Sequence, residues 1–243
     1  MDTQLSPTPL PATMAAGMDA DSRFVVVMLM TLKPDGAAGL ASFRVQAAPL
    51  FQDHDLRIER QLDVRAKGQI VGENRFALPD MIQVLSFPSA DRFKAYLADP
   101  RYRALAPLRD AALASMTVLA GQSLDVSRVS TPGLGPVASR LYGVGLVSFK
   151  PQGEQALDTF NQRAQDLFKR HGMHVERMMR VQHCAQPVGD KDERMNPERV
   201  VVFFLDDASA MRGYVSDPEY VALAPLRDKG LNTYDFFVGT SSC

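Results

Sequence analysis

Two runs of apolar, mostly β-branched residues begin the two halves of the chain, at Phe24–Leu32 and Tyr142–Phe149. Neither run alternates with polar residues, so both predict strands that are covered on both faces. A helical pattern follows each run, over Ala37–Gln52 and Glu154–Arg170. Each half of the chain therefore predicts a strand followed by a helix.

The remaining elements of each half come in the same order. Period-two alternation predicts a second strand at Leu56–Val64 and at His174–Val181. The elements after it are apolar strands at Met81–Phe87 and Val200–Leu205, helices at Ser89–Leu97 and Ala208–Val215, and last strands at Ser115–Ala120 and Tyr234–Val238. An Asp-Pro step follows each of these helices, where Asp99 and Asp217 can cap a further helix. The order β-α-β-β-α-β is that of a ferredoxin-like unit.

The two halves are copies of one another. Tyr96–Leu113 and Tyr214–Leu231 are identical at 12 of 18 positions. The match extends outward to the pairs Gly121 and Gly239, His54 and His171, and Glu59-Arg60 and Glu176-Arg177. We therefore expect an α+β protein of two tandem ferredoxin-like units, 23–121 and 141–243, with a linker at 122–140 and a flexible tail at 1–22.

A single ferredoxin-like sheet is covered by helices on one face only. Because the first strand of each copy is apolar throughout, the other face must be covered as well. The second copy can cover the first, so the sequence predicts two units packed sheet to sheet as an intrachain pseudo-dimeric α/β barrel. A further homodimer is left open.

Charge and composition exclude several classes of protein. With 27 basic and 28 acidic residues interspersed, the chain has no basic field of the kind that nucleic-acid binding requires. No stretch reaches the roughly 20 apolar residues that a membrane span needs, and the first residues lack the pattern of a signal peptide. Only two cysteines are present. We expect a cytoplasmic protein without nucleic-acid or membrane partners.

The stretch DPRYRALAPLRDAAL, with FPSADRFKAYL before it, resembles the second-helix region of small domains in the dimeric α/β-barrel superfamily. It is similar to domains of unknown function and to antibiotic-biosynthesis-monooxygenase-type domains. The resemblance covers residues 24–121 and 141–239. It implies a range of activities: cofactor-free oxygenases acting on aromatic polyketides, polyketide cyclases, muconolactone-type isomerases, haem-degrading and haem-using enzymes, and proteins without known activity. A fold shared by so many chemistries does not select one of them.

Arginine stands at equivalent places on the second strand of both copies. Strict alternation puts Arg60 on one face with Ile58, Leu62 and Val64, and puts Arg177 on one face with Val175, Met179, Val181 and His183. A buried guanidinium is suited to hold a carboxylate or phenolate, so each arginine is a candidate pocket residue. In the alternative interpretation, each pairs with a carboxylate such as Asp110 or Asp228, or lies at a strand end in water.

His183 has no counterpart in the first copy and can serve as an acid or base. An exposed position at the mouth of a loop is the alternative. His174 and the helix residues Tyr214 and Tyr220 are candidate substrate contacts, although packing alone would explain the tyrosines. No converging ligand set predicts a metal. Haem is disfavoured because neither second helix contains a histidine.

These patterns lead to a first hypothesis of a small-molecule enzyme without a tightly bound cofactor. It would oxygenate, cyclise or isomerise an aromatic or polyketide-like substrate in a pocket between sheet and helices. Arg177 and His183 would be its catalytic residues, and Arg60, His174, Tyr214 and Tyr220 would bind the substrate. A carboxylate-bearing ligand would also suit the arginines. The alternatives are a non-catalytic ligand-binding or accessory protein and, third, a haem-binding or haem-using protein.

Overall fold

The computed structural model describes residues 23–73, 76–126, 140–191 and 196–241. The first half holds β1 (Phe24–Leu32), α1 (Gly36–Asp53), β2 (Arg57–Val71), β3 (Met81–Phe87), α2 (Ala90–Ala98), α3 (Pro100–Ala112) and β4 (Leu113–Leu124). The second half holds β5 (Leu141–Phe149), α4 (Glu154–Arg163), α5 (Gln165–Arg170), β6 (Met173–Val188), β7 (Arg199–Leu205), α6 (Ala208–Ser216), α7 (Pro218–Gly230) and β8 (Leu231–Ser241).

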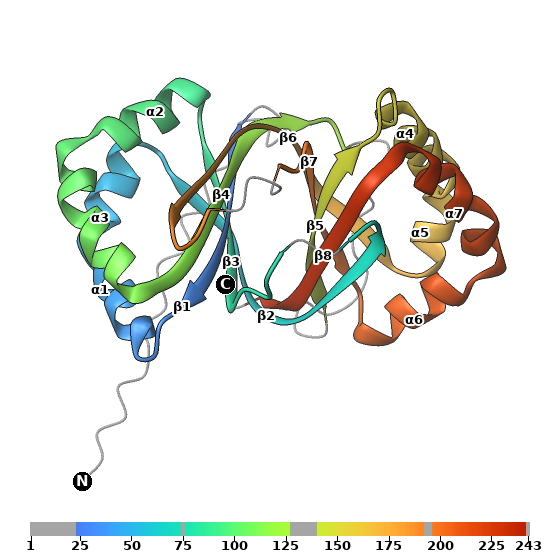
Figure 1. The fold of residues 1–243 in the computed structure, drawn as a ribbon, viewed down its shortest axis with the longest axis horizontal. Coiled ribbons are helices and arrows are strands. Elements are labelled where there is room, and N and C mark those ends of the chain that lie inside the picture. The colour runs from blue at the N-terminus through green and yellow to red at the C-terminus, as the bar shows by residue number, and fades with distance from the viewer. Residues whose placement is uncertain (1–22, 74–75, 127–139, 192–195, 242–243) are drawn as a thin grey trace, which may run out of the picture.

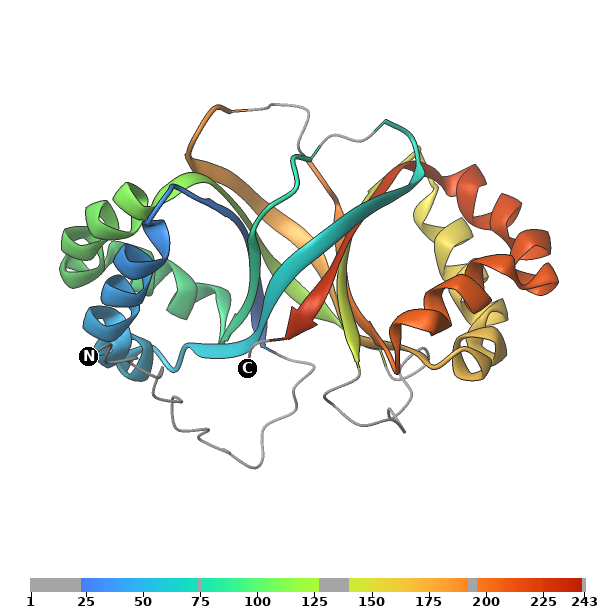
Figure 2. The same ribbon diagram turned by 90° about the horizontal axis from the view of Figure 1, so that it is seen from below.

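The strands of both halves form one closed barrel. Its order is β1-β3-β2-β8-β5-β7-β6-β4, and every pairing is antiparallel. Each half contributes four strands in the ferredoxin-like order, β4-β1-β3-β2 and β8-β5-β7-β6. Helices α1 to α3 cover one side of the barrel and α4 to α7 cover the opposite side (Figures 1 and 2). The predicted fold class, an intrachain pseudo-dimeric α/β barrel, is confirmed.

The two halves also join at their sheet edges, which the sequence did not predict. β2 pairs with β8, and β4 pairs with β6. β2 and β6 therefore run past the predicted ends at Val64 and Val181, to Val71 and Val188. A strand continues only while its backbone groups find partners. Here the partner for the second part of each strand comes from the other half of the chain.

Other predicted bounds differ for local reasons. The predicted helix over 154–170 is divided into α4 and α5 at Ala164, whose φ of −86° and ψ of 4° leave the helical region. β4 reaches Leu124, inside the predicted linker. The predicted tail 1–22 and linker residues 127–139 lie outside the described residues, so the division into 23–121 and 141–243 stays a prediction.

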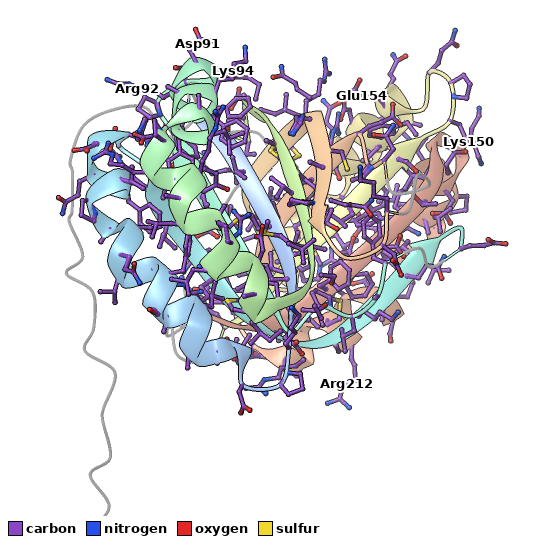
Figure 3. The ribbon with its side chains drawn as sticks, turned by 60° about the vertical axis from the view of Figure 1, so that its left-hand side comes forward. Asp91, Arg92, Lys94, Lys150, Glu154 and Arg212 are labelled. Atoms are coloured by element: carbon purple, nitrogen blue, oxygen red, sulfur yellow. The ribbon has the colours of Figure 1, made fainter. Side chains whose placement is uncertain are left out.

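Three layers of apolar side chains hold the molecule together. The barrel interior is filled from both halves, with Val25, Val27, Leu62, Ile82, Leu119, Tyr142, Val144, Leu146, Val202 and Phe237 among its buried residues. Separate apolar layers lie between each half of the barrel and its own helices. Both faces of every central strand are therefore covered, which explains why β1 and β5 lack alternation. Charged residues such as Asp91, Arg92 and Lys94 project outward from α2 (Figure 3).

Two equivalent glycines sit where the halves meet. A Cβ on Gly121 of β4 would lie 1.8 Å from the carbonyl oxygen of Arg180 on β6. A Cβ on Gly239 of β8 would lie 2.1 Å from the carbonyl oxygen of Asp63 on β2. The strands approach so closely only because these residues have no side chain. The glycine pair found in the repeat therefore marks the two junctions of the barrel.

Two ion pairs join the halves beside these junctions. Arg60 pairs with Glu176, and the Nε of Arg177 lies 2.9 Å from a carboxylate oxygen of Glu59. The same arginines donate hydrogen bonds to hydroxyls of the opposite copy, Arg60 to Ser241 over 3.4 Å and Arg177 to Ser123 over 3.3 Å. Each arginine therefore contacts the other half of the chain, in an arrangement with approximate twofold symmetry.

Among the described residues, no helix is both long enough and apolar enough to cross a membrane.

Replacing either junction glycine with alanine is expected to destabilise the barrel. Gly121→Ala and Gly239→Ala each force a backbone oxygen to move, which should lower the free energy of unfolding by about 1–3 kcal/mol. Urea denaturation measures this loss. Thr240→Ala, at the exposed neighbour of Gly239, is the control and should change the midpoint little. Equal urea midpoints for all three variants would contradict the close approach of the strands at Gly121 and Gly239.

Removing one acid of the ion pairs is expected to leave a half-buried arginine without its carboxylate. Glu59→Ala and Glu176→Ala should each lower the free energy of unfolding by about 1–3 kcal/mol. The double variant Glu59→Ala/Arg177→Met should recover part of the lost free energy of unfolding, because it removes both partners of the ion pair and leaves neither charge without the other. Asp166→Ala, which breaks the exposed Asp166–Lys169 pair, should cost less than about 0.5 kcal/mol. The same denaturation curves test all four variants.

Candidate functional site

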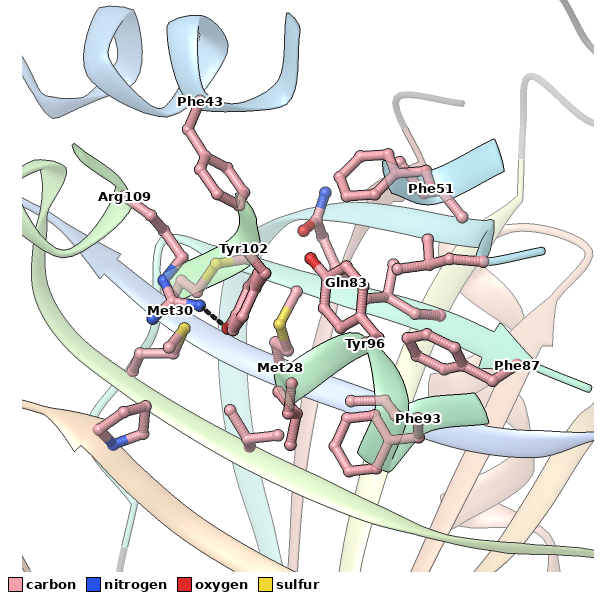
Figure 4. Close-up of a pocket in the computed structure, with 18 of the residues that line it drawn as sticks. Met28, Met30, Phe43, Phe51, Gln83, Phe87, Phe93, Tyr96, Tyr102 and Arg109 are labelled. Carbon is pink, nitrogen blue, oxygen red and sulfur yellow. Dashed lines mark hydrogen bonds between the residues drawn. The ribbon is translucent and has the colours of Figure 1, made fainter. Parts of the chain in front are cut away.

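A cavity of about 190 Å³ lies between the first half of the barrel and its helices (Figure 4). Its floor comes from β1, β2, β3 and β4, and its roof from α1, α2 and α3. One edge comes from the second half of the chain, where His183, Ala185 and Pro187 of β6 line the cavity. The β4–β6 junction brings these residues there. The cavity is thus built by both copies.

Most of the lining is apolar, and much of it is aromatic. The rings are those of Phe43, Phe51, Phe87, Phe93, Tyr96 and Tyr102, and the flexible side chains include Met28, Met30 and Met116. Aromatic rings and thioethers adapt well to a flat ligand. An engineered protein cavity of about 150 Å³ is known to bind benzene. The space therefore holds at least one aromatic ring of a ligand, and its edge at the exposed His183 is open.

A few polar groups reach this apolar space. The guanidinium of Arg109 donates a hydrogen bond to the hydroxyl of Tyr102 and another to Asp110, whose Oδ1 lies 2.8 Å from its Nε. Burial raises the pKa of Tyr96 far above its usual range, so this hydroxyl keeps its proton. Gln83 is 5% exposed and faces the cavity from β3. These groups can position a ligand that carries a hydroxyl or carbonyl oxygen.

The second half has a smaller cavity at the equivalent place, of about 100 Å³. Tyr214, Tyr220 and Arg227 line it as Tyr96, Tyr102 and Arg109 line the first. Arg227 donates to Tyr220 over 2.5 Å and to Asp228 over 2.7 Å. In each copy the three residues of this arginine–tyrosine–aspartate group lie on one helix, α3 or α7. The arginine also stands over a ring of the neighbouring helix, Phe43 of α1 or Phe160 of α4.

Aromatic rings occupy the space in the second cavity. Phe203, Tyr234 and Phe236 replace Leu85, Met116 and Val118 of the first half. Each ring lies over a strand glycine, at Gly143, Gly145 and Gly68 respectively, and a Cβ on any of these glycines would lie under 3 Å from the ring. The first half has Val26, Met28 and, from β6, Ala185 at those places. The first cavity is the larger of the two because its strands lack the three rings that fill the second cavity.

The predicted arginines lie away from both cavities. In each second strand one extra residue, Glu59 or Glu176, shifts the register of pairing. Beyond such a bulge, successive side chains point to the opposite face of the sheet from the one that strict alternation predicts. Ile58 consequently faces the helices, whereas Leu62 faces the barrel interior. Arg60 stands over the ring of Tyr142, 4.4 Å from its centre, at one end of the barrel.

The prediction that each arginine shares a face with the apolar residue two positions before it was therefore wrong. Val175 faces the helices, and Met179 on the far side of the bulge faces the interior. The alternative interpretation, an arginine paired with a carboxylate, describes the geometry better. Its partners are Glu176 and Glu59, while Asp110 and Asp228 pair with Arg109 and Arg227.

The other predicted residues fall in three places. His183 is exposed and lines the edge of the first cavity, so it does not meet Arg177. His174 is buried, stacked on Phe204 at 4.7 Å between ring centres, with Asp206 3.3 Å from its Nε2. Tyr214 and Tyr220 line the second, smaller cavity. The structure thus separates the residues that the sequence grouped into one site.

Sequence reasoning did not select Gln83. A signal was present, because the repeat aligns Gln83 with Val201, and a polar residue on an otherwise apolar strand is unusual. The large size of the first cavity had no comparable signal, since it depends on which rings pack over which glycines.

Neither haem nor a metal fits the described site well. The cavity of about 190 Å³ is too small to enclose the four pyrrole rings of a haem, and the one histidine of its described lining, His183, is exposed at the edge. The other three histidines are engaged elsewhere: His54 with Asp99, His171 with Asp217, and His174 with Asp206. No three acidic, histidine or cysteine side chains of the described residues converge as metal ligands would.

The fold places the chain among known structures, although its sequence does not. No family model and no curated protein matches it. A candidate monooxygenase from Lactobacillus acidophilus NCFM is 10% identical with a TM-score of 0.50, over 91% of this chain and 95% of that one. An anthrone oxidase-like protein is 12% identical with a TM-score of 0.53, over 92% and 93%.

A variant of chlorite dismutase from Candidatus Nitrospira defluvii is 11% identical with a TM-score of 0.56, over 92% of this chain and 93% of that chain. At such low identity the likeness concerns the fold alone. The closed eight-stranded barrel, the two equivalent helix layers and these neighbours agree on that fold. The chain has the fold of the dimeric α/β-barrel superfamily.

Proposed function

We propose that this protein is a small-molecule enzyme of the oxygenase type, which works on an aromatic substrate without a tightly bound cofactor. The observation that carries the proposal is the composite cavity of the first half, lined by six aromatic rings and by buried polar groups. The likeness to proteins described as a monooxygenase and as anthrone oxidase-like adds support for oxygen chemistry. Fold likeness alone does not assign a reaction.

The residues of the cavity can act on an acidic C–H group beside an aromatic ring or on a phenolic O–H group. His183 at the edge can accept the proton, because histidine is the side chain that most often serves as a general base. The Tyr96 hydroxyl, kept protonated by burial, can donate a hydrogen bond to the resulting anion. Arg109, which pairs with Asp110, holds the hydroxyl of Tyr102 at the same cavity.

Dioxygen would be both the oxidant and the source of oxygen. With anthrone, the anion forms a C–O bond to dioxygen, and the resulting peroxide anion takes back the proton from His183. The O–O bond then breaks as the second hydrogen on that carbon is lost, which releases one water and leaves anthraquinone. One anthrone and one dioxygen thus give one anthraquinone and one water. Cyclisation and isomerisation need the same anion and no dioxygen, so they remain related alternatives for the same cavity.

A non-catalytic ligand-binding protein is the second candidate. It is favoured by one observation: the deep part of the cavity holds hydrogen-bonding groups, and no aspartate or glutamate of the described residues lines the cavity. Within the described lining, the exposed His183 is the only residue suited to act as a base. A binding protein would need the ring-lined space and the polar groups, and would not need that histidine.

Oxygen consumption with anthrone tests the enzyme proposal. Purified protein should consume dioxygen above the rate of anthrone alone, and Tyr96→Phe should lower that rate about 10- to 100-fold by removing one donor to the anion. Tyr234→Phe, which removes a hydroxyl in the second half, is the matched control and should keep the full rate. An oxygen electrode measures all three. Anthrone binding without oxygen consumption would favour the second candidate.

The role of His183 in the reaction is separable from binding. If His183 accepts the proton, His183→Gln should reduce the rate of oxygen consumption about 100-fold. Binding of anthrone should be nearly unchanged in this variant, because the side chain lies at the exposed edge. A full rate in this variant would show that the histidine takes no part in the reaction.

A further inference from the structure

Two amide side chains meet on the helix-facing side of the first half. Gln61 of β2 and Gln83 of β3 are register partners, and the Nε2 of Gln83 donates a hydrogen bond to the Oε1 of Gln61 over 3.1 Å. The equivalent register partners in the second half are Met178 and Val201, both 8% exposed. The same point of the same fold is thus polar in one copy and apolar in the other.

The apolar pair shows that the fold does not require amides here. A buried amide costs free energy unless its hydrogen bonds are satisfied. The bond to Gln61 satisfies one donor of Gln83 and fixes the plane of its amide. The Oε1 of Gln83 accepts no hydrogen bond from the described residues, and Figure 4 shows the amide directed into the cavity. A polar atom held in that position is suited to a ligand.

We propose that Gln83 determines the specificity of the cavity by accepting a hydrogen bond from a hydroxyl on an aromatic ring. Gln61 is the positioning residue that orients the Gln83 amide. The ligand class is a phenol or the enol form of an aromatic ketone. This inference rests on the proposed function for its site, and it goes further by naming the group that is recognised.

The rest of the lining narrows the ligand class. The Gln83 amide lies in a cavity lined by six aromatic rings, so the hydroxyl is expected on an aromatic ligand. Arg44 and Arg109 bring positive charge to the lining, and no carboxylate of the described residues lines it. An ammonium-bearing ligand would find no carboxylate among the described lining residues, whereas a neutral or weakly acidic hydroxyl needs none. The second cavity lacks the amide, so one chain should bind one ligand.

The experiment compares three small probes by isothermal titration calorimetry on the full chain. Phenol donates a hydrogen bond, anisole only accepts one, and toluene does neither. The wild type should bind one phenol per chain and prefer phenol to anisole. In the double variant Gln61→Met/Gln83→Val, this preference should fall about tenfold, the effect of losing one neutral hydrogen bond.

The double variant is chosen because it reproduces the residue pair of the second half and leaves no orphaned amide, so it should fold. Gln83→Val alone serves as the second variant and should lose the same preference. Tyr234→Phe is the control and should bind all three probes as the wild type does.

An unchanged phenol-to-anisole ratio in both variants would overturn the inference, as would a wild type that prefers anisole or binds none of the probes. The outcome is independent of catalysis. A protein that shows the phenol preference and consumes no dioxygen with anthrone would retain this inference and lose the proposed enzyme function.

Discussion

The barrel closes because β2 and β6 each continue past the edge of their own sheet and pair with a strand of the other half. Backbone hydrogen bonds must be satisfied at a sheet edge, and here each half supplies the partner that the other lacks. The bulges at Glu59 and Glu176, the close approach at Gly121 and Gly239, and the crossed ion pairs all lie at or beside these two junctions. The first cavity depends on the same constraint, since part of its edge comes from β6.

Duplication gives the chain two equivalent cavities, and packing makes them unequal. Side chains that line an unfilled space lack the contacts that a packed interior would give them. The first cavity, of about 190 Å³, is therefore less closely packed than the second, of about 100 Å³. Rings packed over Gly143, Gly145 and Gly68 fill the second cavity and stabilise that half. Such an arrangement lets one copy supply stability while the other keeps an open site.

The polar groups of the first cavity are of two kinds. The arginine–tyrosine–aspartate group recurs in both halves, and in each its arginine packs over a ring of the neighbouring helix, so the group belongs to the scaffold. Gln83 occurs in one half only, beside the larger cavity. Comparison between the copies thus separates structural polar residues from those that the fold does not need. Gln83 is therefore the better guide to a ligand, because burying its amide does not stabilise the fold.

The sequence by itself determined the duplicated α+β units, the order of their elements and the covered central strands, because hydrophobic periodicity and capping residues are local properties. β1 and β3 have the predicted bounds. Tertiary structure alone decided how far β2 and β6 extend, because their partners lie in the other half. It also decided which way Arg60 and Arg177 point, because a single bulge reverses the alternation that the sequence suggests. Because β6 pairs with β4 of the other half, His183 of the second copy lines the cavity of the first.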